Sequence, residues 1–285
     1  MRTATSTITA VVVAAALMSC GSAQSQASAP SQAREASSTA AAPATQSSSP
    51  PNPTSIEPRS GRPLALVYRG PAGCEGCSEP VARMLRNSRY GFDVRYIGPD
   101  ETLKLEASSF AGATLYAQPG GEDDTPAAYQ SLGASGQQAI RNFVAAGGRY
   151  LGICQGAYLA GTRYSGLGLL APGNVGWYIG SRGASTRSED PAVIPIKWGK
   201  RTFYLYFQDG PYMIPSGVAG ERVLARYTNG RAAVLVRPYG SGRVAAVGPH
   251  PEATRSWYSE DGLHRRYPDA INVNLGDRIL AQLMR

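Results

Sequence analysis

Short apolar segments of strand length alternate with helix-like segments through most of this chain. Residues 64–70 (LALVYRG), 93–98 and 113–121 are apolar runs bounded by glycine, proline or acidic residues. Residues 78–88 and 136–147 place their apolar side chains at helical spacing. Buried parallel strands joined by crossover helices produce this alternation. We therefore predict an α/β fold, a doubly wound and mostly parallel sheet with helices on both faces.

The middle of the chain has a different pattern. Residues 174–230 contain aromatic and β-branched segments (WYIGSRGAS, VIPIKW, RTFYLYFQDG) separated by turn residues. Such segments favour antiparallel hairpins, so we predict a β-rich insertion or sheet edge here. Two further apolar runs follow at 232–240 and 242–252, and a closing helix is expected over about 271–284.

The first sixty residues differ from the rest in composition. They hold only five charged side chains and are dominated by Ala, Ser, Pro, Gln and Thr. The apolar run at 10–18 is too short to cross a bilayer, which takes about 20 residues, so residues 1–19 are predicted to be a signal peptide. The run ends in LMSCG, which resembles a bacterial lipoprotein signal whose cysteine, Cys20, becomes the lipid-modified N-terminus. A secreted protein with an incidental cysteine is the alternative.

Residues 20–62 have no hydrophobic period and too little apolar surface to order themselves. We predict a flexible tether there, followed by one folded domain over residues 63–285. A lipid on Cys20 would hold that domain at the outer face of the bacterial cell membrane. We therefore expect an exported protein, either a lipoprotein or a secreted one.

Cys154 stands between two glycines, Gly152 and Gly156, where a predicted strand runs directly into a helix. A sharp strand-to-helix turn of this kind exposes a nucleophile, and its glycines let strand and helix pass closely. The amides at the start of the helix favour the thiolate form of the cysteine. Cys154 is therefore a candidate nucleophile, with a small buried cysteine in a glycine-rich turn as the alternative.

A thiol nucleophile needs a base, and the chain has two histidines. His250 follows an apolar run, at the sheet edge where the nucleophile is expected, and Glu252 lies close enough to orient its imidazole. A hydrogen-bonded turn histidine is the alternative for His250. His264 lies in a polar stretch and is predicted to be a surface residue.

Glycines after the third predicted strand complete the candidate site. Gln118 is followed by Pro119, Gly120 and Gly121. Backbone N–H groups of Gly120 and Gly121 could approach a tetrahedral oxyanion together with the amide of Gln155. On its own a Pro-Gly-Gly segment indicates only a turn, so its value here comes from the nucleophile and base beside it.

The order Pro-Gly-Gly, Gly-Ile-Cys-Gln-Gly and His-Pro-Glu resembles the class I glutamine amidotransferase-like superfamily. That resemblance implies the fold and a triad of Cys154, His250 and Glu252. More narrowly, the segments between residues 66 and 252 resemble the N-terminal domain of eukaryotic biotin–protein ligases and its bacterial relatives. The resemblance does not include the biotin-transferring catalytic domain, so we do not predict biotin ligation.

Cys74 and Cys77 lie in the loop after the first predicted strand. In an exported protein the expected state of this pair is a short disulfide, which leaves Cys154 free. A thioredoxin-like redox role is the alternative, because the motif begins a helix after a strand. A zinc site is not expected, since the sequence offers no second pair of ligands.

These features favour a thiol-dependent amide hydrolase or acyl-transfer enzyme that forms a thioester at Cys154 and needs no cofactor or metal. Its expected partner is a small-molecule or peptide amide substrate. The net charge is +8, but the arginines are scattered and do not alternate with aromatic residues, so nucleic acid is not an expected partner. The alternative function is a non-catalytic ligand-binding lipoprotein, in which aromatic residues of the insertion wall a pocket or a partner surface: Trp177, Tyr178, Trp198, Tyr204, Tyr206 and Tyr212. These rings could equally pack into the core of a hairpin sheet.

Overall fold

The computed structural model of the chain describes residues 61–265 and 274–285. The predictions for the signal peptide, Cys20 and the tether up to residue 60 lie outside the described residues, as do the first residues of the predicted closing helix, 271–273. None of the described helices is both long enough and apolar enough to cross a membrane.

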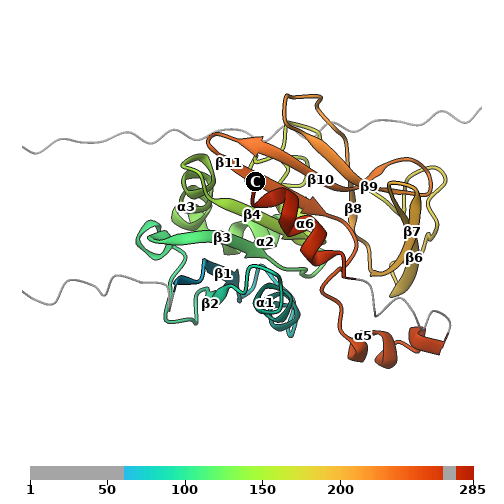
Figure 1. Cartoon of the computed structure of the whole chain (residues 1–285), viewed down its shortest axis with the longest axis horizontal. Coiled ribbons are helices and arrows are strands. Elements are labelled where there is room, and N and C mark those ends of the chain that lie inside the picture. The colour runs from blue at the N-terminus through green and yellow to red at the C-terminus, as the bar shows by residue number, and fades with distance from the viewer. Residues whose placement is uncertain (1–60, 266–273) are drawn as a thin grey trace, which may run out of the picture. The chain divides into compact units, whose positions relative to one another are not determined.

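The described residues form one sheet of 11 strands with helices packed against it (Figure 1). The strands are β1 (Leu64–Tyr68), β2 (Asp93–Ile97), β3 (Ala113–Gln118), β4 (Arg149–Ile153), β5 (Val175–Trp177), β6 (Ala192–Trp198), β7 (Arg201–Phe207), β8 (Pro211–Met213), β9 (Arg222–Tyr227), β10 (Ala232–Tyr239) and β11 (Gly242–Val247). The helices are α1 (Ser78–Arg86), α2 (Thr125–Ser131), α3 (Gly133–Ala145), α4 (Gln155–Leu159), α5 (Arg255–Glu260) and α6 (Gly276–Leu283), with 3-10 turns η2 (Ala107–Phe110) and η3 (Leu263–Arg265).

The strand order is β2-β1-β3-β4-β11-β10-β9-β6-β7, and β8 and β5 branch from β10. The first five strands in this order run parallel to their neighbours, and the remaining pairings are antiparallel. The predicted doubly wound α/β fold is confirmed. The predicted β-rich segment 174–230 contains β5 to β9, which continue the same sheet.

Helices cover both faces of the parallel strands because alternate residues of each strand point to opposite sides. In β1, Leu64 and Leu66 belong to a buried cluster with side chains of α3 and α4. Ala65 and Val67 belong to the cluster on the other face, with side chains of α1 and α6. All five residues of β1 are therefore buried, which explains why its sequence is continuously apolar.

Two helices differ from their predicted bounds. The predicted helix 136–147 begins earlier, at Gly133, and ends at Ala145. Its first turn contains no buried side chain, because contact with the core begins at Gly136. The apolar spacing in the sequence therefore identified only the part of the helix that packs against the core. The helix α2, which precedes it, was not predicted. The closing helix α6 begins at Gly276.

The strand order reverses between β1 and β3, because β2 lies on one side of β1 and β3 on the other. In open α/β sheets ligands bind at such a reversal, beyond the carboxyl ends of the strands. The loops that follow β1, β3 and β4 all begin at this edge of the sheet.

Candidate active site

Cys154 occupies the turn between β4 and α4 in a strained backbone conformation. Its φ is 51° and its ψ is −112°, a region that residues with a Cβ rarely adopt and that costs about 1–3 kcal/mol. Hydrogen bonds on both sides hold it there. Its N–H donates to the carbonyl of Val247 in β11 at 2.8 Å, and its carbonyl accepts from the N–H of Ala157 at 2.8 Å. Such a turn presents the side chain at the end of the sheet.

The two glycines around Cys154 are required by close backbone approaches. A Cβ at Gly152 would collide with the carbonyl of Gly156, and a Cβ at Gly156 would collide with the carbonyl of Gln118. The steric reason expected from the sequence is therefore present. Neither contact could be relieved by moving a flexible side chain, because the obstacle is backbone in both cases.

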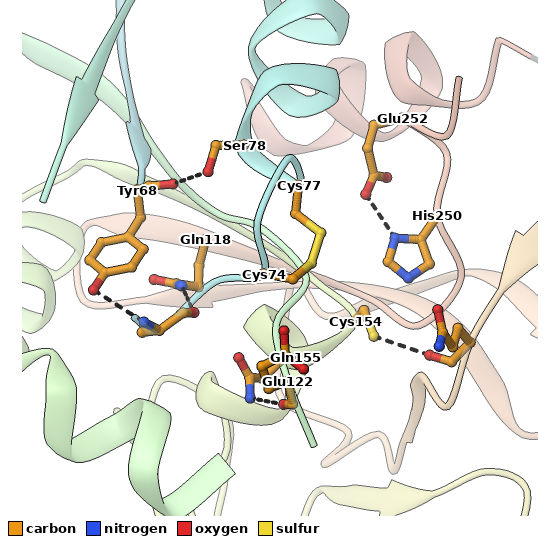
Figure 2. The surroundings of a disulfide bond; sticks show 12 residues. Tyr68, Cys74, Cys77, Ser78, Gln118, Glu122, Cys154, Gln155, His250 and Glu252 are labelled. Atoms are coloured by element: carbon orange, nitrogen blue, oxygen red, sulfur yellow. Dashed lines mark hydrogen bonds and ion pairs between the residues drawn. A yellow bond between two sulfur atoms is a disulfide. The ribbon is translucent and has the colours of Figure 1, made fainter. Parts of the chain in front are cut away.

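His250 and Glu252 follow β11 and are both buried, at 5% and 6% exposure. The Nδ1 of His250 lies 2.8 Å from Oε1 of Glu252, and the imidazole is close enough to Cys154 for the charge of an ionised sulfur to act on it. Figure 2 shows the ring between the carboxylate and the sulfur. The structure therefore brings the three predicted triad residues together, with His250 hydrogen-bonded to Glu252.

The protonation of His250 depends on its two neighbours. Burial lowers the pKa of the imidazole, but the negative charges of Glu252 and of a Cys154 thiolate outweigh burial and raise it to about 10. The positively charged imidazolium is thus the favoured form beside an ionised sulfur.

The glycines after β3 lie against the triad. A Cβ at Gly120 would stand 3.0 Å from Cε1 of His250 and 3.7 Å from Cβ of Cys154, and a Cβ at Gly121 would collide with the side-chain amide of Gln155. Gln155 is the first residue of α4, so its N–H has no acceptor within the helix. The structure places Gly120, Gly121 and Gln155 together at the nucleophile.

The triad opens into a cavity of about 800 Å³, a volume typical of small-molecule sites. Cys154, Gln155 and His250 form part of its wall. Of the aromatic residues from the insertion, Trp177 and Tyr206 also line it. Tyr178 and Tyr212 instead belong to the buried core, Trp198 packs against that core, and Tyr204 is 42% exposed. Some of the aromatic residues of the insertion therefore line the cavity, and others pack into or against the core.

Cys74 and Cys77 form the predicted disulfide in the loop after β1 (Figure 2). The N–H of Cys74 donates to the carbonyl of Gly120 at 3.0 Å. The buried Gln118 also fixes this loop: its Nε2 donates to the carbonyl of Ala72 at 2.6 Å. Both cysteines line the cavity, so the disulfide loop forms one of its walls.

The segment after β7 contributes contacts that the sequence did not assign. The thiol of Cys154 donates to the carbonyl of Gln208 at 3.4 Å. Tyr158 donates to the carbonyl of Asp209 at 3.2 Å. Asp209 itself has a φ of 47°, so its backbone is strained beside the nucleophile. The signal available in the sequence was the Gln-Asp-Gly-Pro turn that follows a strand.

Aromatic residues position the base. The N–H of His250 donates to the carbonyl of Tyr206 at 2.9 Å. The rings of Tyr206 and Trp257 meet the imidazole edge-on, with centroids 5.7 Å and 5.3 Å away. Trp257 lies in the short helix α5 and was missed, because nothing in its local sequence indicates a site. The side chain of His264, predicted to be on the surface, lies outside the described residues.

Comparisons with known proteins bear on the fold of this domain. Residues 64–165 match the family model described as "Biotin-protein ligase, N terminal". The solved structure of PurLQS from Thermotoga maritima is similar with a TM-score of 0.51 and 16% identity, covering 78% of this chain and 98% of that one. The domain has a class I glutamine amidotransferase-like fold.

A structure described as a glutamine amidotransferase is similar to this domain with a TM-score of 0.48 and 19% identity, covering 74% of this chain and all of that one. No curated protein matches the sequence. At such identities the likeness concerns the fold, and the chemistry of this domain has to be argued from its own residues.

Proposed function

We propose that the domain is a thiol-dependent amide hydrolase or acyl-transfer enzyme in which Cys154 forms a thioester with its substrate. The observation that carries the proposal is that Cys154 and His250 line the same cavity of about 800 Å³, with the imidazole hydrogen-bonded to the buried Glu252. A nucleophile, a base and a group that orients the base are the parts that acyl transfer needs.

In the proposed reaction His250 takes the proton of the Cys154 thiol, and the thiolate sulfur bonds to the carbonyl carbon of an amide. The carbonyl electrons move to oxygen and form an oxyanion. When the oxyanion collapses, the carbon–nitrogen bond breaks, and the imidazolium of His250 gives its proton to the departing amine. Water, or an acceptor amine, then attacks the thioester with His250 as base and releases Cys154. Glu252 holds the imidazole and stabilises its charge throughout.

The oxyanion is proposed to accept hydrogen bonds from the N–H of Gln155 and from the backbone beside Gly120 and Gly121. Their position against the nucleophile supports this role. We further propose that residues 1–19 are a signal peptide, that a lipid on Cys20 anchors the chain, and that residues 63–285 act on an extracytoplasmic amide, as in a peptide or the cell wall.

The rate of Cys154 alkylation by iodoacetamide, followed by mass spectrometry against pH, tests the catalytic proposal. We expect fast labelling near pH 6 that His250→Ala slows and His264→Ala, the matched control, leaves unchanged. Labelling that rises only near the free-thiol pKa of about 8.5, with both variants alike, would contradict the proposal. So would amide-cleaving activity that survives Cys154→Ala.

A second candidate is a ligand-binding protein that keeps the cavity without the chemistry. The observation in its favour is Trp177, which lines the cavity and is 45% exposed, as a ring that stacks on a ligand would be. A ligand whose affinity is unchanged in Cys154→Ala but lost in Trp177→Ala would favour this candidate.

A further inference from the structure

The cavity beside Cys154 is strongly acidic, although the chain as a whole carries a net charge of +8. Six carboxylates line it: Glu75, Glu122, Asp123, Asp209, Glu260 and Asp261. Among the described residues of the cavity wall there is neither lysine nor arginine. The carboxylates come from the disulfide loop, the loop after β3, the turn after β7 and the region of α5, so they surround the cavity instead of forming one patch.

These carboxylates are not neutralised by the described part of the protein. Within residues 61–265 and 274–285, the ion pairs involve Arg69, Arg95 and His250, and their acidic partners are not among the six. Two of the six have polar contacts that leave their charge in place. Asp261 accepts from the hydroxyl of Tyr206 at 2.8 Å, and Asp209 accepts from the indole of Trp177 at 2.6 Å.

Asp209 directly follows Gln208, whose carbonyl accepts the hydrogen bond of the Cys154 thiol. Burial raises the pKa of Asp209 to about 6; the Trp177 hydrogen bond opposes this, and the charges of Asp123 and Glu189 add to it. Its negative charge is thus held at a cost that a cation in the cavity would offset. The exposed face of Trp177 offers the same cation an aromatic surface.

A separate observation concerns the side-chain amide of Gln155. Gln155 is 3% exposed and lines the cavity. Its Nε2 donates to the carbonyl of Glu122, whereas its Oε1 has no hydrogen-bond partner among the described residues. A buried acceptor left without a donor is costly. The side-chain oxygen of Gln155 is therefore an acceptor without a donor among the described residues.

We infer that the cavity selects amide substrates that carry a positively charged nitrogen group, an ammonium or a guanidinium, close to the carbonyl that Cys154 attacks. The inference rests on the proposed function and names its substrate class. Such a group supplies both a positive charge for the carboxylates and N–H donors for acceptors such as Gln155 Oε1. A neutral or acidic amide would leave the six carboxylates without a counter-charge.

A metal ion is the other kind of cation to consider. The described residues contain no group of three or more His, Cys, Asp and Glu side chains that could hold one. The carboxylates are spread around the wall, and this arrangement suits an extended organic cation better than a compact ion that needs several oxygen ligands at once.

The test uses the full chain with Cys20→Ser, in which Cys154 is the one thiol outside the disulfide. Three methanethiosulfonate reagents carry a trimethylammonium, a sulfonate or a neutral methyl group. In each reaction the thiolate forms a disulfide with the reagent sulfur and methanesulfinate leaves, so the bond formed and the leaving group are the same for all three. Rates are divided by those of free cysteine. We expect the cationic reagent to react about tenfold faster than the anionic one at low salt, with the difference shrinking as salt is raised.

The charge variant is Glu75→Gln, Asp123→Asn and Asp209→Asn combined, which keeps the shape of three walls. We expect it to bring the cationic and anionic rates within about twofold of each other. The matched control, Glu106→Gln, removes one charge from an exposed residue outside the cavity, and its side chain keeps the oxygen that accepts from Ser108. We expect this control to retain the full ratio.

The outcomes separate the two proposals. Equal normalised rates for the cationic and anionic reagents would overturn the inference, as would a ratio that the triple variant leaves unchanged. If the neutral reagent still labels Cys154 fast near pH 6 in a His250-dependent way, the catalytic proposal survives that result. Slow labelling that ignores His250 would overturn the catalytic proposal, and with it the inference about its substrate.

Discussion

At the scale of the residue, the chemistry of the site depends on where the proton lies between Cys154 and His250. The imidazole is buried, and burial alone would keep it neutral. The charges of Glu252 and of the thiolate reverse that preference and raise the pKa of His250 to about 10. Glu252 thus acts through His250, as a positioning residue, and its contribution is electrostatic as well as geometric.

Glu252→Gln tests this contribution, because it keeps an oxygen for the Nδ1–H of His250 and removes the charge. Loss of a carboxylate at 2.8 Å lowers the pKa of the imidazole by about one to three units. We expect alkylation of Cys154 at pH 6 to slow by about tenfold and the pH profile to move. Mass spectrometry measures both, with the melting temperature as a check on folding. An unchanged profile in a folded variant would exclude the electrostatic role.

Asp209→Asn should stabilise the protein in a pH-dependent way. Because burial raises the pKa of Asp209 from 3.8 to about 6, the folded state keeps this proton when the unfolded state has lost it. Below pH 3.8 the carboxyl group is protonated in both states and does not affect stability. Its destabilising effect grows as the pH rises from 3.8 to 6 and is complete above 6. The group is half-buried, so solvent screening reduces the effect to about 1 kcal/mol.

Urea denaturation at pH 4 and pH 8 checks this prediction. The variant should gain free energy of unfolding at pH 8 and little at pH 4, while Glu106→Gln should show no such difference. A gain of equal size at both values would point to a cause other than charge. Binding sites often keep residues that lower stability because those residues bind the ligand. A stabilising substitution in the cavity wall would fit such a site.

At the scale of the element, the junction of β4 and α4 depends on the absence of side chains. A Cβ at Gly152 would collide with the carbonyl of Gly156, so strand and helix would have to separate. We expect Gly152→Ala to lower the free energy of unfolding by about 2–3 kcal/mol and to slow Cys154 alkylation. The control is Gly173→Ala, where φ is +75° and the added Cβ meets nothing within 4 Å.

Gly173→Ala should cost about 1 kcal/mol through its backbone conformation alone and leave alkylation unchanged. Chemical denaturation and labelling of both variants measure the difference. Equal losses of stability in the two variants would mean that the close approach at Gly152 is relieved elsewhere.

The predicted helix 136–147 illustrates the same dependence on packing: apolar spacing located the part of α3 that contacts the sheet and missed its exposed first turn.

At the scale of the whole molecule, the composition divides the chain into a polar N-terminal part and a folded domain. The proposed lipid anchor lies in the first part, and the candidate site lies in the second. We expect Cys20→Ser to abolish incorporation of labelled palmitate in a bacterial host and to move the protein from the membrane fraction to the soluble fraction. Palmitate incorporation that persists in the variant would rule out lipidation at Cys20.

Cys20→Ser should leave the pH profile of Cys154 alkylation unchanged, because the two cysteines belong to separate parts of the chain. Cys154→Ser is the matched control, since it should keep the palmitate label and lose the alkylation. A profile altered by Cys20→Ser would show that the N-terminal part influences the domain.

The sequence by itself determined the chemical groups available for the site. One glycine-flanked cysteine and two histidines leave few choices, and the apolar runs before Cys154 and His250 identify both as strand-end residues. The doubly wound class followed from the same runs, because a strand buried on both faces has to be continuously apolar.

Only the tertiary structure decided which other residues face the reacting sulfur. Asp209, Tyr206 and Trp257 reach the cavity because β11 pairs with β4 and the antiparallel strands continue the sheet from there. The pairing of β11 with β4 joins segments about a hundred residues apart, and local periodicity carries no information about such partners. The acidic wall of the cavity is likewise a product of the pairing, since its carboxylates are scattered among ordinary surface residues along the chain.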